Sequence, residues 1–348
     1  RQDGANVIDL GCLPNTPFAH LAETVQALKA AGFKVSVDSL LPEDLVTGGR
    51  AGADFLLSLQ RHSLWVLEKV DATPIIIGTP PTSLRSLYRT IELLLKEGVR
   101  FIADPILDPI NFNFTESIVR YRNLRNRYPD IEIMMGVGNL TELTHVDSAG
   151  TNTLLMGIIS ELGIQHILAT EVSEHCRKSI KEADLARRIM YASSADSIPP
   201  KGYHNGLMAL HERKPFPYTE QEIREFAEDV RDPNFRIQVC EAGVFIYNRD
   251  GIWNATDPFD HYPNLNVFAD GGHAFYLGVE LARAQIAWQL GKRYEQDEEL
   301  AWGIAVERAS QDLANFKQEG STMPTREDRK KRRKNKAKKD PKLDARRC

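Results

Sequence analysis

The stretch VIDLG at residues 7–11 is the first of seven short apolar segments, and together these segments decide the fold. They lack the alternation of half-buried strands, which predicts strands buried on both faces, as in a parallel sheet. A helical pattern follows nearly every one, so the chain is predicted to form a TIM-type (β/α)₈ barrel that lacks its first strand. The other six segments are KVSVDS (34–39), DFLLSL (54–59), TPIIIGT (73–79), RFIADPI (100–106), IEIMMGVG (131–138) and HILATE (166–171).

The sequence predicts two folded domains and a tail. Residues 1–195 carry units two to eight of the barrel, and a linker rich in Ser, Pro and Gly follows at 196–204. Residues 205–318 carry a helix, a hairpin pattern and a mostly helical stretch from 273 to 316, which predicts a small α+β domain. Residues 319–348 are rich in Lys and Arg without apolar periodicity, which predicts a disordered basic tail.

Composition excludes several classes of protein. Apolar residues make up 42% of the chain and charged residues 26%, which is ordinary for a globular protein. No apolar run approaches the roughly 20 residues that span a bilayer, so no membrane partner is expected. The four cysteines lie far apart, which favours a reducing, cytoplasmic location and argues against a thiolate-bound metal.

Charge is distributed unevenly along the chain. The net charge is −4, yet the segment from Arg326 to Cys348 holds 13 Lys or Arg against 4 Asp or Glu. This basic tail is expected either to contact an acidic partner or RNA, or to have no binding role. Because the rest of the chain is acidic, a dedicated nucleic-acid-binding function is not expected.

Polar residues stand at the ends of the predicted strands, among them Asp38 and Asp104. The carboxyl ends of barrel strands meet at one end of the fold, where barrel enzymes carry their sites. Two carboxylates there can accept paired hydrogen bonds from an amidine-like N–H/NH₂ edge. For any single carboxylate the alternative is a helix cap or a loop contact. The full set of strand-end residues is Asp9, Asp38, Asp104, Asn139 and Glu171.

Five segments occur in the order and at the spacing of a known family. They are GANVIDLG (4–11), VSVDS (35–39), GADFLLSL (52–59), ADPILDP (103–109) and MMGVGNLTELT (134–144). Together they resemble the pterin-binding barrels, which are the dihydropteroate synthases and the methyltetrahydrofolate:corrinoid methyltransferases. The run GVGNLTE followed by DSAGTN, with the appended second domain, is most similar to archaeal dihydropteroate-synthase-related proteins, which are linked to making tetrahydromethanopterin-type carriers.

The resemblance implies roles for individual residues. Asp104 would grip the 2-amino/N3 edge of the pterin, and Asp38 would hold the ring from a neighbouring strand. Asp9 would line the floor of the barrel mouth. Asn139 would hydrogen-bond the ring near N5, because a neutral amide can both donate and accept. The expected catalytic residues are Asp38, Asp104 and Asn139.

The chain also departs from the family pattern. The family has Asn-Asp where this chain has Leu57-Ser58, so one pterin contact is expected to move to Ser58. Glu171 would line the site where the synthases have an Arg, and a carboxylate there repels a diphosphate unless Mg²⁺ intervenes. A helix predicted to begin at Ser173 could still offer its amide groups to a phosphate. The strand whose Asn holds Mg²⁺ in synthases is the missing one, and since the chain begins with Arg1 we expect that strand upstream.

The resemblance implies a pterin-binding, dihydropteroate-synthase-like protein in the biosynthesis of a folate- or tetrahydromethanopterin-type one-carbon carrier. Its substrate would be a dihydropterin or tetrahydropterin, with Mg²⁺ as a candidate ion and no metal-ligand set of its own. Such a protein would be a transferase in which an arylamine displaces pyrophosphate. The alternatives are a methyl-tetrahydropterin methyltransferase-like protein and a non-catalytic pterin-binding module. A homodimer is a further expectation.

Overall fold

The computed structural model describes residues 1–13 and 16–306. The chain divides into two compact units, Arg1–Leu207 and Met208–Cys348. The basic tail predicted at 319–348, and the end of the domain predicted at 205–318, lie outside the described residues. None of the described helices combines the length and the apolar character needed to cross a membrane.

The first unit is built on a seven-stranded parallel sheet whose strands follow chain order. Each strand hydrogen-bonds to the next one along the chain, so every crossover returns on the same side and the sheet curls, as in a TIM-type barrel. Among the described strands the first and the last each pair with one neighbour, so the curled sheet is open between them. The strands lie in the predicted segments: β1 (Val7–Gly11), β2 (Lys34–Asp38), β3 (Phe55–Leu59), β4 (Thr73–Ile76), β5 (Ile102–Ala103), β6 (Glu132–Gly136) and β7 (His166–Leu168).

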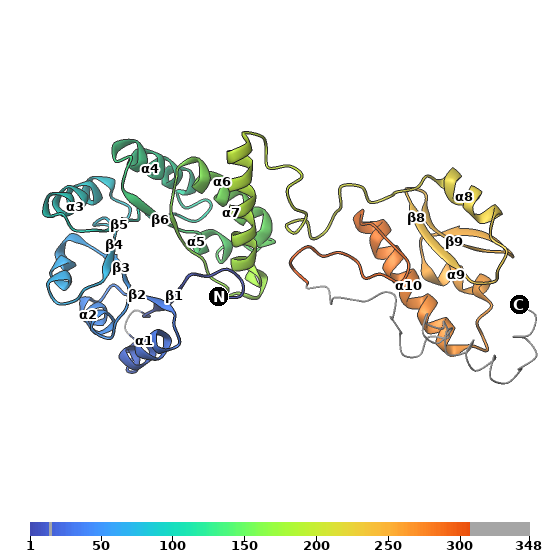
Figure 1. Cartoon of the computed structure of the whole chain (residues 1–348), viewed down its shortest axis with the longest axis horizontal. Helices are drawn as coiled ribbons and strands as arrows, with labels where there is room; N and C mark the ends of the chain where they lie inside the picture. Colours follow the sequence, from blue (N-terminus) through green and yellow to red (C-terminus); the bar gives the residue numbers. More distant parts are fainter. Residues whose placement is uncertain (14–15, 307–348) are drawn as a thin grey trace, which may run out of the picture. The chain divides into compact units, whose positions relative to one another are not determined.

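Helices cover the outer face of this sheet (Figure 1). α3 shows how local sequence sets their bounds, because the Ser83 hydroxyl accepts a hydrogen bond from the Ser86 amide and the helix ends at Gly98 in the left-handed conformation. The helices are α1 (Leu21–Ala30), α2 (Pro42–Arg50), α3 (Leu84–Glu97), α4 (Phe114–Arg127), α5 (Gly138–Thr141), α6 (Ser148–Glu161) and α7 (Ser179–Asp196), with 3₁₀ segments η1 (Arg61–Glu68) and η2 (Glu174–Cys176).

The predicted start of the last helix of this unit, Ser173, is wrong by six residues. The segment forms only the 3₁₀ turn η2, and the chain then breaks at Lys178, whose φ is 72°. α7 begins after this break, at Ser179. The positive φ at Lys178 prevents one continuous helix, because a right-handed helix needs φ near −60° at every residue.

The two faces of the sheet bury different sets of side chains. Val37, Leu56 and Ile133 face outward and pack beneath the helices in the main core. Leu57 and Ile102 face inward, and each belongs to a smaller apolar cluster on the inner face. The strands are therefore apolar on both faces, which explains why their sequences lack alternation. The inner cluster is completed by Ile75, Met134, Phe55 and Leu168.

The second unit is a three-stranded antiparallel sheet, in the order β10-β9-β8, with helices around it. The predicted hairpin pattern corresponds to three strands and not two. The long helix ends at Leu290 because Gly291 takes a left-handed cap with φ 62°, so the prediction of helix through the described residues beyond 291 was wrong. The elements are α8 (Glu220–Glu228), β8 (Arg236–Cys240), β9 (Gly243–Asn248), β10 (Gly251–Ala255), α9 (Pro258–Leu265) and α10 (Gly271–Leu290).

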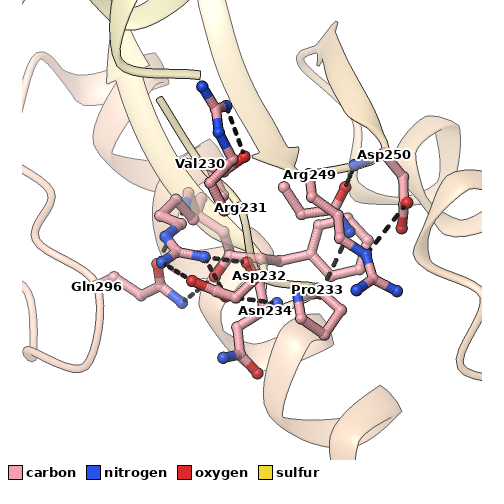
Figure 2. A network of polar contacts seen from close by, with 12 residues as sticks. Val230, Arg231, Asp232, Pro233, Asn234, Arg249, Asp250 and Gln296 are labelled. Carbon is pink, nitrogen blue, oxygen red and sulfur yellow. Dashed lines mark hydrogen bonds and ion pairs between the residues drawn. The ribbon is translucent and has the colours of Figure 1, made fainter. Parts of the chain in front are cut away.

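A polar network fastens the turn that leads into β8 (Figure 2). Asp232 accepts two hydrogen bonds of 2.6 Å from the guanidinium of Arg236 and one of 3.0 Å from the Asn234 amide. Its carbonyl accepts a hydrogen bond from the Arg249 amide at the end of β9. On β8 itself, the Ile237 amide donates to the side chain of Gln296 at 2.9 Å. These contacts hold the turn against β8 and against the end of β9, so they stabilise the fold of this unit.

The packing of α2 on β2 predicts the effect of filling one glycine. A Cβ on Gly48 would lie 2.6 Å from Cγ2 of the fully buried Val37, so Gly48→Ala forces the helix away from the strand. We expect a loss of about 1–3 kcal/mol in the free energy of unfolding, measured by urea denaturation. Gly157→Ala in α6 is the matched control, because its Cβ would meet nothing within 4 Å. Equal stability of the two variants would contradict this close packing.

Candidate functional site

Three carboxylates gather on the inner face of the sheet: Asp9 lies in the middle of β1 and not at its predicted end, Asp38 ends β2, and Asp104 directly follows β5. Asp9 Oδ1 accepts a hydrogen bond of 2.5 Å from the Ser36 hydroxyl. Asp38 Oδ1 accepts one of 2.6 Å from the Ser58 hydroxyl. Burial is the main cause that raises the pKa of Asp9 and of Asp104, and the charge of Asp38 adds to both, so the three carboxylates share one electrostatic environment. The structure therefore brings together three of the predicted site residues.

The register of the sheet explains why these side chains face inward. Asp9 pairs with Ser36, and Ser36 pairs in turn with Phe55, which packs in the inner apolar cluster. Asp38 pairs with Leu57 of the same cluster. Neighbouring residues at paired positions of a parallel sheet point to the same face. The carboxylates of β1 and β2 thus stand beside the apolar side chains of the inner face.

Ser58 reaches Asp38 through an irregularity in β3. The residue has a φ of 69°, and the pairing register with β4 shifts between Leu56 and Leu59. In a regular strand Ser58 would point away from the face that Leu57 occupies. A bulge of this kind re-aims a side chain, and a positive φ at a non-glycine residue costs free energy. In the structure the Ser58 hydroxyl, which was predicted to contact the pterin, donates a hydrogen bond to Asp38.

Asp104 is the most buried of the three carboxylates, with 6% of its surface exposed. Its Oδ1 accepts a hydrogen bond of 2.8 Å from the hydroxyl of Tyr121, a fully buried residue of α4. The same oxygen accepts another of 2.8 Å from the Ile106 amide. Both described hydrogen bonds to this carboxylate go to Oδ1, which leaves Oδ2 as the acceptor for a ligand.

The loop that carries Asp104 is held in a strained conformation by Arg120. Ile106 has a φ of 65°, which is costly for a β-branched residue. The Arg120 guanidinium donates to the carbonyls of Pro105 and Ile106 at 3.0 and 2.7 Å. It also donates to Asp108 at 2.7 Å. Arg120 is thereby a positioning residue for the Asp104 loop.

Burial raises the pKa of two of the carboxyl groups. The pKa of Asp104 rises from 3.8 to about 6, because burial outweighs the hydrogen bonds from Ile106 and Tyr121. The pKa of Asp9 also rises to about 6, because burial outweighs the hydrogen bond from Ser36 and the charge of Asp38 adds to it. Both groups therefore ionise close to neutral pH, where a bound cation or N–H donor would favour the charged form.

Asn139 lies in the short helix α5, directly after β6, and Glu171 lies in the loop after β7; both residues are exposed. The Asn139 amide donates a 2.8 Å hydrogen bond to the carbonyl of Leu107, in the Asp104 loop. Glu171 accepts a 3.0 Å hydrogen bond from the Ile180 amide in the first turn of α7. Both side chains already have intrachain partners, which tie neighbouring loops of the strand ends together.

Glu142 bridges the loops after β6 and β7. Its two oxygens accept hydrogen bonds of 2.8 Å from the consecutive amides of Val172 and Ser173. Burial acts to raise the pKa of this carboxyl, but hydrogen bonds from the Ser173 hydroxyl and these amides outweigh it and lower the pKa to about 2. Glu142 therefore stays ionised and fills the amide groups that were predicted to be open to a phosphate at Ser173.

Sequence reasoning missed Tyr121, Arg120, Ser36 and Glu142. Tyr121 could have been found, because it lies on the apolar stripe of its helix with Leu124, and a buried Tyr hydroxyl needs a polar partner. Ser36 could have been found from strand alternation, since it precedes Asp38 by two residues. Arg120 and Glu142 gave no signal, because each acts on backbone groups that only the folded loops bring near.

Clustered metal ligands were searched for in the part of the chain that the structure describes. Within residues 1–13 and 16–306, no group of three or more His, Cys, Asp or Glu side chains is arranged to hold a metal ion. Oδ1 of each site carboxylate accepts hydrogen bonds from hydroxyl or amide donors of the chain.

Comparisons with known proteins give one related sequence and several structural neighbours. No protein-family model matches the sequence. An uncharacterized protein of Methanocaldococcus jannaschii is 29% identical over 342 residues, covering 86% of this chain and 64% of that protein. The chain thus spans less than two thirds of the length of that relative.

The structural neighbours include dihydropteroate synthases. The Yersinia pestis synthase with a pterine-sulfa conjugate is 16% identical, over 56% of this chain and 85% of its own, with a TM-score of 0.44. The Thermus thermophilus synthase is 15% identical, over 55% of this chain and 84% of its own, with a TM-score of 0.44. The fold assignment rests on the strand order and pairing described above, and not on these similarities.

The raised pKa of Asp104 predicts how stability depends on pH. The native carboxyl keeps a proton that the unfolded chain releases above pH 3.8, so this stabilisation is complete below about pH 4 and is lost as pH rises through 6. Asp104→Asn cannot ionise and retains the acceptor oxygen. As the pH rises from 4 to 7, the free energy of unfolding of this variant should increase by about 2 kcal/mol relative to that of the wild type.

The measurement is urea denaturation of both proteins across that range, followed by far-UV circular dichroism. Asp9 contributes to both proteins alike and cancels in the difference. Parallel pH profiles would show that the Asp104 carboxyl is not buried as described.

Proposed function

We propose that this protein binds a pterin ring at the carboxyl ends of its parallel strands, between Asp38 and Asp104. It acts as a dihydropteroate-synthase-like protein in the biosynthesis of a folate- or tetrahydromethanopterin-type one-carbon carrier. The observation that carries the proposal is the fixed orientation of the Asp104 carboxylate, with Oδ1 held by Tyr121 and Ile106.

The geometry suits a ring edge that presents adjacent N–H groups. Within the described residues, the hydrogen bonds to Asp38 and Asp104 both use Oδ1, so each carboxylate offers Oδ2 to a ligand. Charge-assisted hydrogen bonds of this kind are about twice as strong as neutral ones. A pterin presents such an edge at N3 and the 2-amino group, and its donors would compensate the mutual repulsion of the two carboxylates.

An apolar surface lies beside the carboxylates and suits the faces of a flat ring. Leu57 pairs with Asp38 across the sheet, and its neighbours on the inner face are Ile75, Ile102 and Met134. Ligand sites commonly combine such a surface with a few convergent polar groups that fix orientation. The combination supports a planar heteroaromatic ligand rather than a flexible polar one.

Two reactions are compatible with ring binding. A synthase-type transfer of the pterin to an arylamine is the first candidate, and it requires stabilisation of a departing anion. Methyl transfer from a tetrahydropterin, like non-catalytic binding, requires only that the ring be oriented. The acidic surroundings of the site favour the second group, because Asp9, Asp38 and Asp104 would all oppose an anion that develops nearby.

Replacing Asp104 tests the proposed ring binding. Asp104→Asn keeps the shape of the side chain but replaces one acceptor oxygen by an N–H donor, which would face the donors of the ring. We expect the affinity for 6-hydroxymethyl-7,8-dihydropterin, measured by isothermal titration calorimetry at pH 7.5, to fall by about 100-fold, since the lost contact is a charge-assisted pair.

The matched control is Asp130→Asn, an exposed residue in the turn that precedes β6. It removes the same charge at the opposite end of the sheet and should leave the affinity unchanged. Unchanged affinity in Asp104→Asn would contradict the pterin assignment.

A further inference from the structure

We propose that an exposed aromatic face in the second unit binds the Lys- and Arg-rich segment 329–339 of the same chain. The aromatic face consists of Phe259 and Tyr262 on α9 and Phe268 in the turn that leads to α10. The segment, called the basic segment below, reads RKKRRKNKAKK. This inference is independent of the proposed ring binding, since it concerns the other unit of the chain.

Large apolar side chains stand on the outer side of α9. Phe259 is 84% exposed and Phe268 is 70% exposed, whereas His261 and Leu265 of α9 are buried. Tyr262 is 44% exposed, and its ring meets that of Phe268 edge-on with the ring centroids 5.4 Å apart. Exposed apolar side chains that adjoin one another in this way mark a surface that binds a partner.

Three carboxylates border the aromatic face. Asp257 caps α9, and Asp260 lies in the first turn of that helix. Asp270 caps α10, two residues after Phe268. In both caps the described hydrogen bond to the carboxylate goes to Oδ1, which leaves Oδ2 for an outside donor. The face therefore combines aromatic rings with carboxylate acceptors.

Positive charge is lacking in this part of the sequence. Residues 250–282 contain five Asp or Glu and neither Lys nor Arg. None of the ion pairs described in the second unit involves Asp257, Asp260 or Asp270. Those ion pairs join Arg side chains to Glu220, Asp232, Asp250, Glu280 and Glu295. A negatively charged surface of this kind favours a cationic partner.

The basic segment supplies the complementary charge. Nine of its 11 residues are Lys or Arg, and it contains no acidic residue. Guanidinium and ammonium groups bind carboxylates, and they also pack on the faces of Phe and Tyr rings. One cationic segment can therefore engage both kinds of group on the aromatic face. A nucleic acid, in contrast, would be repelled by the three carboxylates.

The basic segment can reach the aromatic face within one chain. The Asp297 carboxylate accepts a 2.6 Å hydrogen bond from Tyr276 of α10, so the chain lies beside this helix shortly before the last described residue, Val306. The residues from 306 to 329 span at most about 80 Å, and α10 is only about 30 Å long. A segment tethered in this way acts at an effective concentration of about 1 mM, so that individually weak contacts suffice.

The test measures whether the basic segment of the chain occupies its own aromatic face. A fluorescein-labelled peptide of residues 326–347 is titrated, at about 50 mM salt, with two full-length proteins. One is the wild type, and in the other every Lys and Arg of 329–339 is replaced by Gln. Fluorescence anisotropy should show at least about tenfold tighter binding of the peptide to the neutralised chain, because its own segment no longer competes.

A variant of the neutralised chain assigns the binding to the aromatic rings. Phe259→Ala combined with Phe268→Ala removes two exposed rings and should weaken peptide binding about tenfold, since each exposed cation–π contact contributes a factor of a few. The matched control is Tyr191→Ala, which removes a 78% exposed ring from α7 in the first unit. This control should leave the affinity unchanged.

A second variant tests the charge without altering a ring or a helix cap. Asp260→Asn in the neutralised chain should weaken peptide binding about threefold, as expected for an exposed ion pair. The matched control is Asp130→Asn, which removes the charge of an exposed carboxylate in the first unit and should have no effect.

Each outcome bears on one part of the inference. Equal affinity of the peptide for the wild type and the neutralised chain overturns occupation by the chain's own segment. An equal effect of the Phe259/Phe268 variant and of Tyr191→Ala, whether a loss or none, overturns binding at the aromatic face. Neither result touches ring binding by the first unit, so failure of this inference is distinguishable from failure of the proposed function.

Discussion

The hydrogen bond from the Tyr121 hydroxyl to Asp104 takes the place of water at a buried carboxylate. A buried carboxylate is costly unless donors surround it, and here one donor comes from a helix and one from the backbone of its own loop. Those two donors fix the orientation of the carboxylate. The strained loop at Ile106, the clamp by Arg120 and the tie from Asn139 to Leu107 all maintain that orientation. The rest of the site is arranged around this one group.

The parallel sheet follows from the sequence because its physical signal is strong. Strands buried on both faces must be apolar throughout, so the seven segments stand out from the polar helices between them. The position of Asp38 and Asp104 at strand ends follows from the same reasoning. The sequence could not show that Ser58 turns toward Asp38, because that depends on a positive φ within a strand that pattern reasoning treats as regular.

Errors occurred where one backbone conformation interrupts a continuous helical pattern. The stretch from Ser173 is amphipathic throughout, yet Lys178 breaks it with a φ of 72° and separates a 3₁₀ turn from α7. In the second unit Gly291 ends α10 in the left-handed conformation, and a glycine just after a periodic stretch is a signal for the end of a helix. The amides of Val172 and Ser173, directly before this 3₁₀ turn, donate to Glu142.

The contact between Asp104 and the ring is the centre of the proposed site. The most direct measurement is a crystal structure of the protein with 6-hydroxymethyl-7,8-dihydropterin. The account predicts that Asp104 Oδ2 lies about 2.7–3.1 Å from N3 or the 2-amino nitrogen, while Tyr121 keeps its hydrogen bond to Oδ1. A ring bound elsewhere in the chain, or one whose N–H edge points away from Asp104, would contradict it.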